Sequence, residues 1–170
     1  MHDLSDDLFL IDPSASPDTP ARRTLSFSRS PTVLLTFAAN RFTRSAARHY
    51  QNTYGIGAMD WRMLVMLSRE PGSSVSHASK TMGIDKAAVS RSLQRLQTKG
   101  LASPTATGSD ERRKDWTLTQ QGADLHDRIL ETALDRQRRL LADFAPDEVQ
   151  QLNSYLSRIL TNLETLDDAD

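Results

Sequence analysis

Apolar side chains recur every three or four positions along most of this chain, which is the spacing of amphipathic helices. The first such stretch begins at Pro31, and Gly55 and Gly57 separate it from the next. The last begins near Pro146, where apolar residues return with spacings of 3, 4, 3, 4 and 3. The pattern predicts helices over residues 31–50, 58–70, 75–82, 86–99, 123–144 and from 146 onward.

One of these helices combines an apolar face with a polar, basic one. Asp85 is suited to cap its N-terminus, and Gly100 is suited to end it because glycine readily adopts the left-handed conformation. At 100° per residue, Val89, Leu93 and Leu96 fall on one side and are expected in the core. The opposite side combines small residues with arginine and glutamine: Ala87, Ser90, Arg91, Gln94 and Thr98. Arginine and glutamine can make bidentate hydrogen bonds to guanine and adenine edges.

The pattern of a β-hairpin follows this helix. Residues 101–107 and 116–119 read as strands, and Gly108-Ser109 favours a turn between them. Pro104 restricts the first strand to a sheet edge or a bulge. Two helices joined by a tight turn and followed by such a hairpin form a winged helix-turn-helix, whose second helix enters the major groove of DNA. Taken singly, the helix is better explained as an ordinary solvated helix, and the charged hairpin tip as an ordinary solvated turn; the combination favours the winged helix-turn-helix.

The hairpin tip adds acidic and basic residues that suit a minor groove. Asp110 and Arg112 lie two positions apart, so on an extended loop they point the same way and Asp110 can brace the loop. Narrow minor grooves concentrate negative potential and favour an inserted arginine. Arg113 and Lys114 complete the basic part of the tip, and Lys114 is expected to hold a phosphate.

These segments resemble the multiple-antibiotic-resistance regulator (MarR) family of bacterial transcription factors. The resemblance rests on IDKAAVSRSLQRLQTKGL, on Asp110-x-Arg112 and on Leu118-Thr119-x-x-Gly122, and it extends over about residues 31–166. It implies a homodimeric winged-helix repressor that a small ligand releases from its operator. It also implies that Arg112 is the wing arginine, with Asp110 as its companion. The positions that correspond to the family's major-groove contacts are Lys86, Ala87, Ser90, Arg91 and Gln94.

Together these patterns predict a mainly α protein with a small β wing, an α+β fold. We expect residues 1–30 to form an N-terminal extension and residues 58–119 a winged helix-turn-helix domain. Residues 31–57 and 120–170 are expected to form a helical dimerisation region. The apolar stripe of the last helix packs either within one subunit or on a second copy, and two half-sites on DNA favour the dimer. The stripe consists of Val149, Leu152, Leu156, Ile159, Leu163 and Leu166.

Composition narrows the function classes. The net charge is −1, but from Lys86 to Lys114 there are seven Lys or Arg residues against two acids, which suits phosphate binding. The chain has no Cys, which excludes a thiol switch, and we predict neither a cofactor nor a metal. None of its four His belongs to a known metal or catalytic spacing, so an enzyme is not expected. Nothing resembles a signal peptide or membrane span, and we expect a cytoplasmic protein.

The effector is expected to be a small aromatic acid or its coenzyme A thioester. The leader, Met59-Asp60-Trp61-Arg62 and the Asp85–Arg91 segment are similar to MarR members that control aromatic-acid degradation. Aromatic side chains beside cationic ones suit such ligands, although Trp61 is equally a core residue. The candidate ligand-binding residues are Arg44, Arg48, His49, Tyr50, Trp61 and Arg62.

Two alternative functions remain, a ligand-independent architectural DNA binder and a protein-docking winged helix. The outward stripe carries no large apolar residue, which favours DNA over a protein partner.

Overall fold

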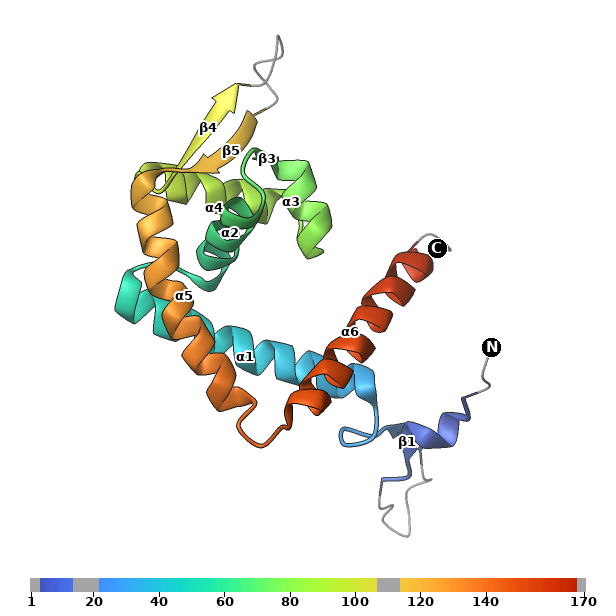
Figure 1. Cartoon of the computed structure of the whole chain (residues 1–170). Helices are drawn as coiled ribbons and strands as arrows, with labels where there is room; N and C mark the ends of the chain where they lie inside the picture. The colour runs from blue at the N-terminus through green and yellow to red at the C-terminus, as the bar shows by residue number, and fades with distance from the viewer. Residues whose placement is uncertain (1–3, 14–21, 107–113, 168–170) are drawn as a thin grey trace. The chain divides into compact units, whose positions relative to one another are not determined.

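The computed structural model describes residues 4–13, 22–106 and 114–167, and it divides into two compact units, residues 1–123 and 124–170 (Figure 1). The chain is mainly helical with a small antiparallel sheet, which confirms the expected fold class. In chain order the elements are the 3-10 helix η1 (Asp6–Leu8), β1 (Leu10–Ile11), β2 (Thr24–Leu25), α1 (Pro31–Tyr54), α2 (Ala58–Arg69), β3 (Ser73–Ser74), α3 (Val75–Met82), α4 (Lys86–Thr98), β4 (Ala102–Ala106), β5 (Lys114–Leu118), α5 (Gln120–Leu140) and α6 (Pro146–Asp167).

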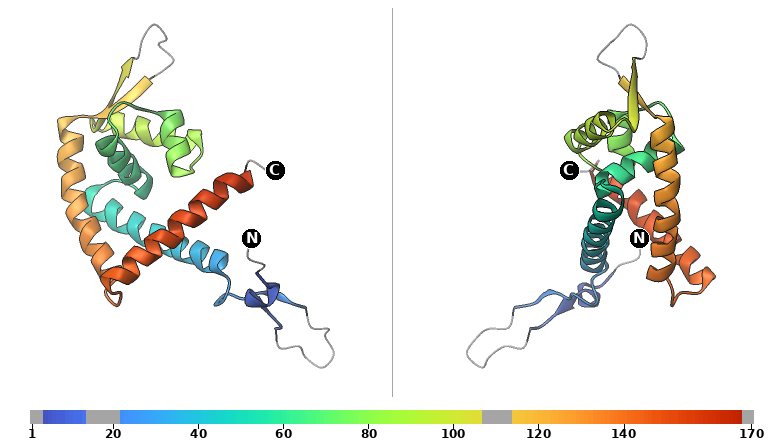
Figure 2. Two further views of the ribbon diagram at one scale, coloured as in Figure 1. Left: turned by 45° about the vertical axis from the view of Figure 1, so that its right-hand side comes forward. Right: turned by 90° about the vertical axis from the view of Figure 1, so that its left-hand side faces the viewer.

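The core of the first unit lies where α2, α3 and α4 gather beside the strands, which both views in Figure 2 show. Helix α2 buries Met63, Leu64 and Leu67, and α4 buries the apolar face predicted for it. The core also includes Ile56 from the α1–α2 connection, Leu101 from the α4–β4 connection and Trp116 from β5. Burial of so many large apolar side chains is the main force that holds the three helices and the sheet together.

The sheet has the order β3-β5-β4, so β4 is an edge strand. Ser73 and Pro104 lie opposite Trp116 from its two sides, on β3 and β4. The edge position suits Pro104, because proline has no N–H to give to a further strand. The wing tip, with the predicted Asp110, Arg112 and Arg113, lies outside the described residues.

The segment before α1 carries a short hairpin, in which Leu10 pairs with Leu25. Arg23 bridges to Asp7, and the guanidinium of Arg29 donates to the carbonyl of Leu10. Apolar side chains of this segment are nonetheless exposed: Leu4, Leu8, Ile11, Leu25 and Phe27.

Two helix bounds differ from the sequence-based expectation. Helix α1 runs to Tyr54 rather than residue 50, because no residue breaks it before Gly55, which ends it at φ 69°. Helix α5 begins at Gln120, so Gly122 lies inside the helix and not before it. The Thr119 hydroxyl accepts the Gly122 N–H at 3.1 Å and thereby caps the helix.

The second unit consists of most of α5 and of α6. The predicted apolar stripe of α6 is half-buried at Val149, Leu152 and Leu156, and exposed from Ile159 to Leu166. Within the described part of the chain, no helix is long and apolar enough to cross a membrane. The predicted division of the chain at residues 57 and 119 stays a prediction, because a dimerisation region is defined by contacts with a second copy.

Candidate nucleic-acid interface

Helix α4 presents the polar stripe that its sequence predicts. Asp85 caps it, because the Asp85 carboxylate accepts the Ala88 N–H at 2.8 Å. Val89, Leu93 and Leu96 are completely or almost completely buried, which fixes the rotation of the helix about its axis. The side that faces away is accessible: Ser90 is half-buried, and the exposed residues are Lys86, Ala87, Arg91, Gln94 and Thr98.

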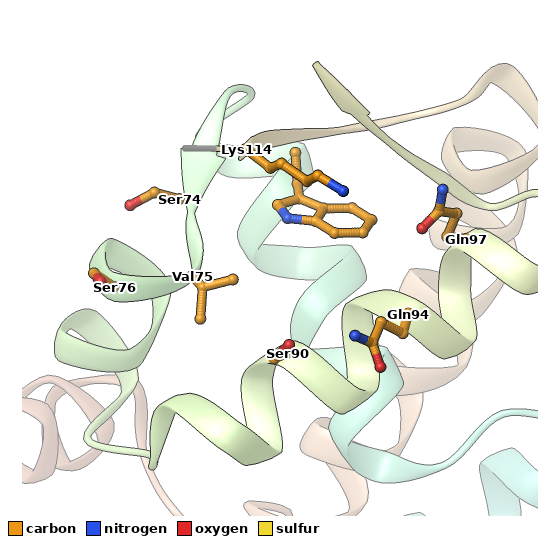
Figure 3. Close-up of a pocket in the computed structure, with 8 residues that line it drawn as sticks. Ser74, Val75, Ser76, Ser90, Gln94, Gln97 and Lys114 are labelled. Atoms are coloured by element: carbon orange, nitrogen blue, oxygen red, sulfur yellow. The ribbon is translucent and has the colours of Figure 1, made fainter. Parts of the chain in front are cut away.

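Beside this stripe lies a hollow of about 360 Å³, lined by residues of β3, α3, α4 and β5 (Figure 3). Figure 3 shows Ser74 and Ser76 at the start of α3 on one side and Gln94 and Gln97 of α4 on the other. Lys114 extends from β5 toward α4. Val75, Ser90 and Trp116 also line the hollow. Only Ser90, Gln94 and Lys114 of this set were candidate site residues from the sequence.

Helix α4, the second helix of the helix-turn-helix and hence its recognition helix, is linked to α2 by hydrogen bonds to a buried carboxylate. Asp60 is only 3% exposed, and its Oδ1 accepts the Ser92 hydroxyl at 2.7 Å and an Arg95 guanidinium N–H at 2.6 Å. The ammonium of Lys99 donates to the carbonyl of Gly55 at 2.5 Å, so α4 also holds the α1–α2 connection. Arg95 therefore has a structural partner, which distinguishes it from the exposed Arg91. Sequence spacing gave no sign of this pair, because its members lie 35 positions apart.

A carboxylate near the start of α3 is also paired. Glu70 lies 2.5 Å from the imidazole of His77, and this hydrogen bond is the main cause that lowers the pKa of Glu70 below its ordinary value. Arg69 adds a smaller favourable charge at 3.3 Å. Both effects keep Glu70 ionised and partnered beside the interface.

The candidate ligand-binding residues divide into two groups. Trp61 and Arg62 line a second hollow, of about 510 Å³, between α2 and the α3–α4 turn. The four candidates on α1 are not among the described residues that line it. Of these, Arg44 and Arg48 are exposed and His49 is half-buried. Tyr50 is buried, and its ring lies tilted at 55° to that of Trp61 with the centroids 5.8 Å apart, so it contacts this lining residue from α1.

The second hollow also contains residues that the sequence analysis missed. Arg69 lies two helical turns after Arg62 on α2, and both residues line the same hollow. The remaining lining residues are mostly apolar: Val65, Met66, Thr81, Met82 and Ile84. An i, i+7 search for a second arginine on the α2 face would have found Arg69.

Comparison with known proteins decides the family. Residues 54–113 match the model of the MarR family. The chain is 30% identical over 117 residues to the HTH-type transcriptional regulator TcaR of Staphylococcus aureus (strain Newman), a match that covers 68% of this chain and 72% of TcaR. The chain belongs to the MarR family. A further relative is the HTH-type transcriptional regulator YdgJ of Bacillus subtilis (strain 168), with 29% identity over 116 residues, which are 66% of this chain and 69% of YdgJ.

Solved structures agree with this assignment of a MarR fold. A MarR/EmrR family regulator from Acinetobacter sp. ADP1 superposes with a TM-score of 0.77 at 28% identity, over 83% of this chain and 99% of that one. MepR of S. aureus, solved as a complex with DNA, has a TM-score of 0.70 at 20% identity, over 79% and 98% of the two chains. As a member of the MarR family, this protein is a DNA-binding transcriptional regulator, which is also how the curated relatives are described.

Proposed function

We propose that this MarR protein is a dimeric repressor that occupies a pseudo-palindromic operator and releases it when a small aromatic acid, or the coenzyme A thioester of one, binds. The observation that carries the DNA-binding part is the division of α4 into a buried apolar face and an exposed polar one. In this proposal Arg91 and Gln94 read bases, whereas Lys86, Ser90 and Lys114 hold phosphates. Arg112 enters the minor groove with Asp110 beside it, and Arg113 adds charge to the tip.

The dimer is supported by the exposed half of the α6 stripe. Leu163 and Leu166 are about half exposed in the single chain. Burial of these side chains against a second copy would remove apolar surface from water and stabilise the dimer. A twofold partner also places two copies of α4 on successive turns of a duplex, which a palindromic site requires.

The DNA-binding function is tested by selection from random sequence. The full chain is incubated with a pool of random duplexes, and the retained fraction is sequenced. We expect an enriched inverted repeat with half-site centres roughly 10 base pairs apart. A pool that stays random through repeated rounds would overturn the proposed operator recognition and would favour the architectural alternative.

The effector is supported by the hollow between α2 and the α3–α4 turn. It joins the indole of Trp61 to two guanidinium groups, from Arg62 and Arg69, and an aromatic carboxylate complements both kinds of group. The hollow borders Ile84, directly before the cap of α4, so a ligand there acts on the element that positions the recognition helix. A ligand changes DNA affinity only if it favours one arrangement over the other.

Thermal-shift measurements test this part separately. The unfolding midpoints of wild type and of Arg62→Ala are measured with and without hydroxybenzoic acids, hydroxycinnamic acids and their coenzyme A thioesters. Arg139→Ala is the matched control, because Arg139 is exposed on α5 and pairs within its own helix with Asp135. We expect a stabilising ligand whose effect is lost in Arg62→Ala and kept in the control. No shift with any of these compounds would favour the ligand-independent alternative.

A further inference from the structure

The hollow beside α4 contains a buried hydrogen-bond donor that has no acceptor. Trp116 is only 5% exposed, and its indole N–H is buried without a hydrogen-bond partner in the described structure. Leaving such a donor unsatisfied costs about 1–3 kcal/mol, and buried donors in folded proteins are nearly always satisfied. Because Trp116 itself lines the hollow, an acceptor that enters the hollow is the natural partner for this N–H.

The other groups around the hollow are also donors or neutral. The Ser74 hydroxyl accepts the His77 N–H at 3.1 Å and caps α3, while the amides of Val75 and Ser76 belong to the open first turn. The N-terminus of a helix carries a partial positive charge that favours anions. Lys114 supplies a full positive charge from β5. Among the described residues that line the hollow, none is acidic.

We propose that this hollow is an oxyanion pocket that holds one phosphodiester group of the DNA backbone, with the Trp116 indole N–H as a donor to a phosphate oxygen. The Ser76 hydroxyl, the first turn of α3 and Lys114 complete the set of donors. The proposal rests on the proposed DNA-binding function and adds a residue to it. Trp116 is a neutral, sequence-independent phosphate contact that fixes how deeply α4 and the wing settle on the duplex.

The position of the hollow fits this assignment. Ser90 and Gln94 belong both to its wall and to the outward stripe of α4, so a backbone phosphate in the hollow lies beside the bases that the stripe would read. Trp116 also lies opposite Ser73 and Pro104 in the sheet. The same residue therefore belongs both to the hairpin of the wing and to the proposed phosphate contact. One phosphate would join α3, α4 and β5.

The direct test follows the two indole N–H resonances of the full chain, which contains two tryptophans, by NMR. Trp116→Phe assigns its resonance by removing it, and if that variant does not fold, Trp61→Phe assigns the remaining one. The protein is titrated with a short mixed-sequence duplex at low salt. We expect the Trp116 resonance to move downfield as the N–H gains a phosphate acceptor. An unchanged Trp116 resonance on the DNA-saturated protein overturns the proposal.

A second titration separates the sources of the oxyanion. Inorganic phosphate alone is added at matched ionic strength. A shift with the duplex but not with phosphate assigns the backbone phosphodiester. A shift with phosphate as well supports the same pocket chemistry and makes free phosphate a competitor of DNA. If the protein bound no duplex at all, the proposed function would fail, and the phosphate titration would still decide whether the hollow binds an oxyanion.

Binding isotherms distinguish a phosphate contact from a structural role. Trp116→Phe keeps a buried aromatic ring and removes the N–H donor together with part of the indole, so we expect duplex affinity to fall roughly tenfold. The slope of log affinity against log salt stays unchanged, because indole is neutral. In Lys114→Gln the slope falls by about one. Wild-type affinity in Trp116→Phe, or an affinity loss that merely follows a lower unfolding midpoint, counts against the contact.

Discussion

The carboxylate of Asp60 accepts hydrogen bonds from the side chain of Arg95 at 2.6 and 3.1 Å, although the two residues lie on different helices. Asp60 is the third residue of α2, and its other oxygen lies 3.5 Å from the N–H of Gly57 at the end of the α1–α2 connection. One buried carboxylate thus links the start of α2 to the middle of the recognition helix. Together with the buried apolar face, this link holds α4 in the rotation that exposes Arg91 and Gln94.

Removal of that carboxylate should destabilise the fold. Asp60→Ala leaves the buried Ser92 hydroxyl without its acceptor and frees Arg95, so we expect a loss of roughly 2–3 kcal/mol in the free energy of unfolding. Urea denaturation measures it. Ser92→Ala removes one hydroxyl donor and leaves the Asp60 carboxylate paired with Arg95, so it should cost less, about 1–2 kcal/mol. A midpoint in Asp60→Ala equal to that of wild type would contradict the assignment.

Arg91→Ala should weaken operator binding by roughly 1–3 kcal/mol and relax sequence choice at one position. Arg91 is exposed on the outward stripe, so its removal should leave the unfolding midpoint near that of wild type. Gel-shift titration on the selected operator and on single-base variants measures both effects. Arg139→Ala, which removes the same charge from α5, should bind like wild type. Equal selectivity in Arg91→Ala and wild type would remove Arg91 from base reading.

A charge in the exposed part of the α6 stripe should dissociate the proposed dimer. Leu163→Glu places a carboxylate where the two copies are expected to pack, and burying it unpaired is unfavourable. Sedimentation velocity should show a monomer at concentrations where wild type is dimeric. Thr161→Glu adds the same charge on the other side of the helix and should stay dimeric. If both variants sediment like wild type, the stripe is not the interface.

Gly122→Ala should be destabilising although Gly122 has no left-handed backbone. An added Cβ would lie 1.9 Å from the carbonyl oxygen of Leu101, and backbone must move to admit it. We expect a cost of roughly 1–3 kcal/mol from this overpacking. At Gly57 an added Cβ meets nothing within 4 Å, so Gly57→Ala should lose at most the small N-cap preference for glycine. Thermal unfolding of the two variants, side by side, tests the difference.

The Glu70–His77 contact predicts an effect in acid. The pKa of Glu70 is lowered in the folded chain, so the pair contributes stability above the unfolded pKa and loses it as pH falls through the lower folded value. His77→Ala should raise the Glu70 pKa toward its ordinary value, and Arg69→Ala should raise it less. An NMR pH titration of the Glu70 carboxyl measures this; a pKa insensitive to His77→Ala would show that the contact is not formed in solution.

Local patterns in the sequence were sufficient for the recognition helix. The cap at Asp85 and the buried face of α4 depend on residues within a few positions, and the structure has them as expected. The predicted start of α5 at residue 123 was wrong, because glycine usually marks a helix boundary and the helix in fact begins at Gln120. Here Gly122 is required by its contact with Leu101, which local sequence does not show.

The parts of the interface that were missed come from distant segments. The hollow of Trp116 joins α3, α4 and β5, and each contributes residues that look unremarkable by themselves. Arg95 is one of several basic residues in its segment, and its partner Asp60 belongs to another helix. Side-chain chemistry was readable from the sequence, whereas proximity across the fold was not.

The edge position of Pro104 has a consequence beyond the wing itself. An open strand edge offers unpaired N–H and C=O groups to any other extended chain, and such edges start strand-to-strand aggregation. Pro104 interrupts the row of donors in the middle of β4, so a foreign strand finds an incomplete ladder there. The described part of this strand edge is thereby protected from pairing with a second copy of the chain.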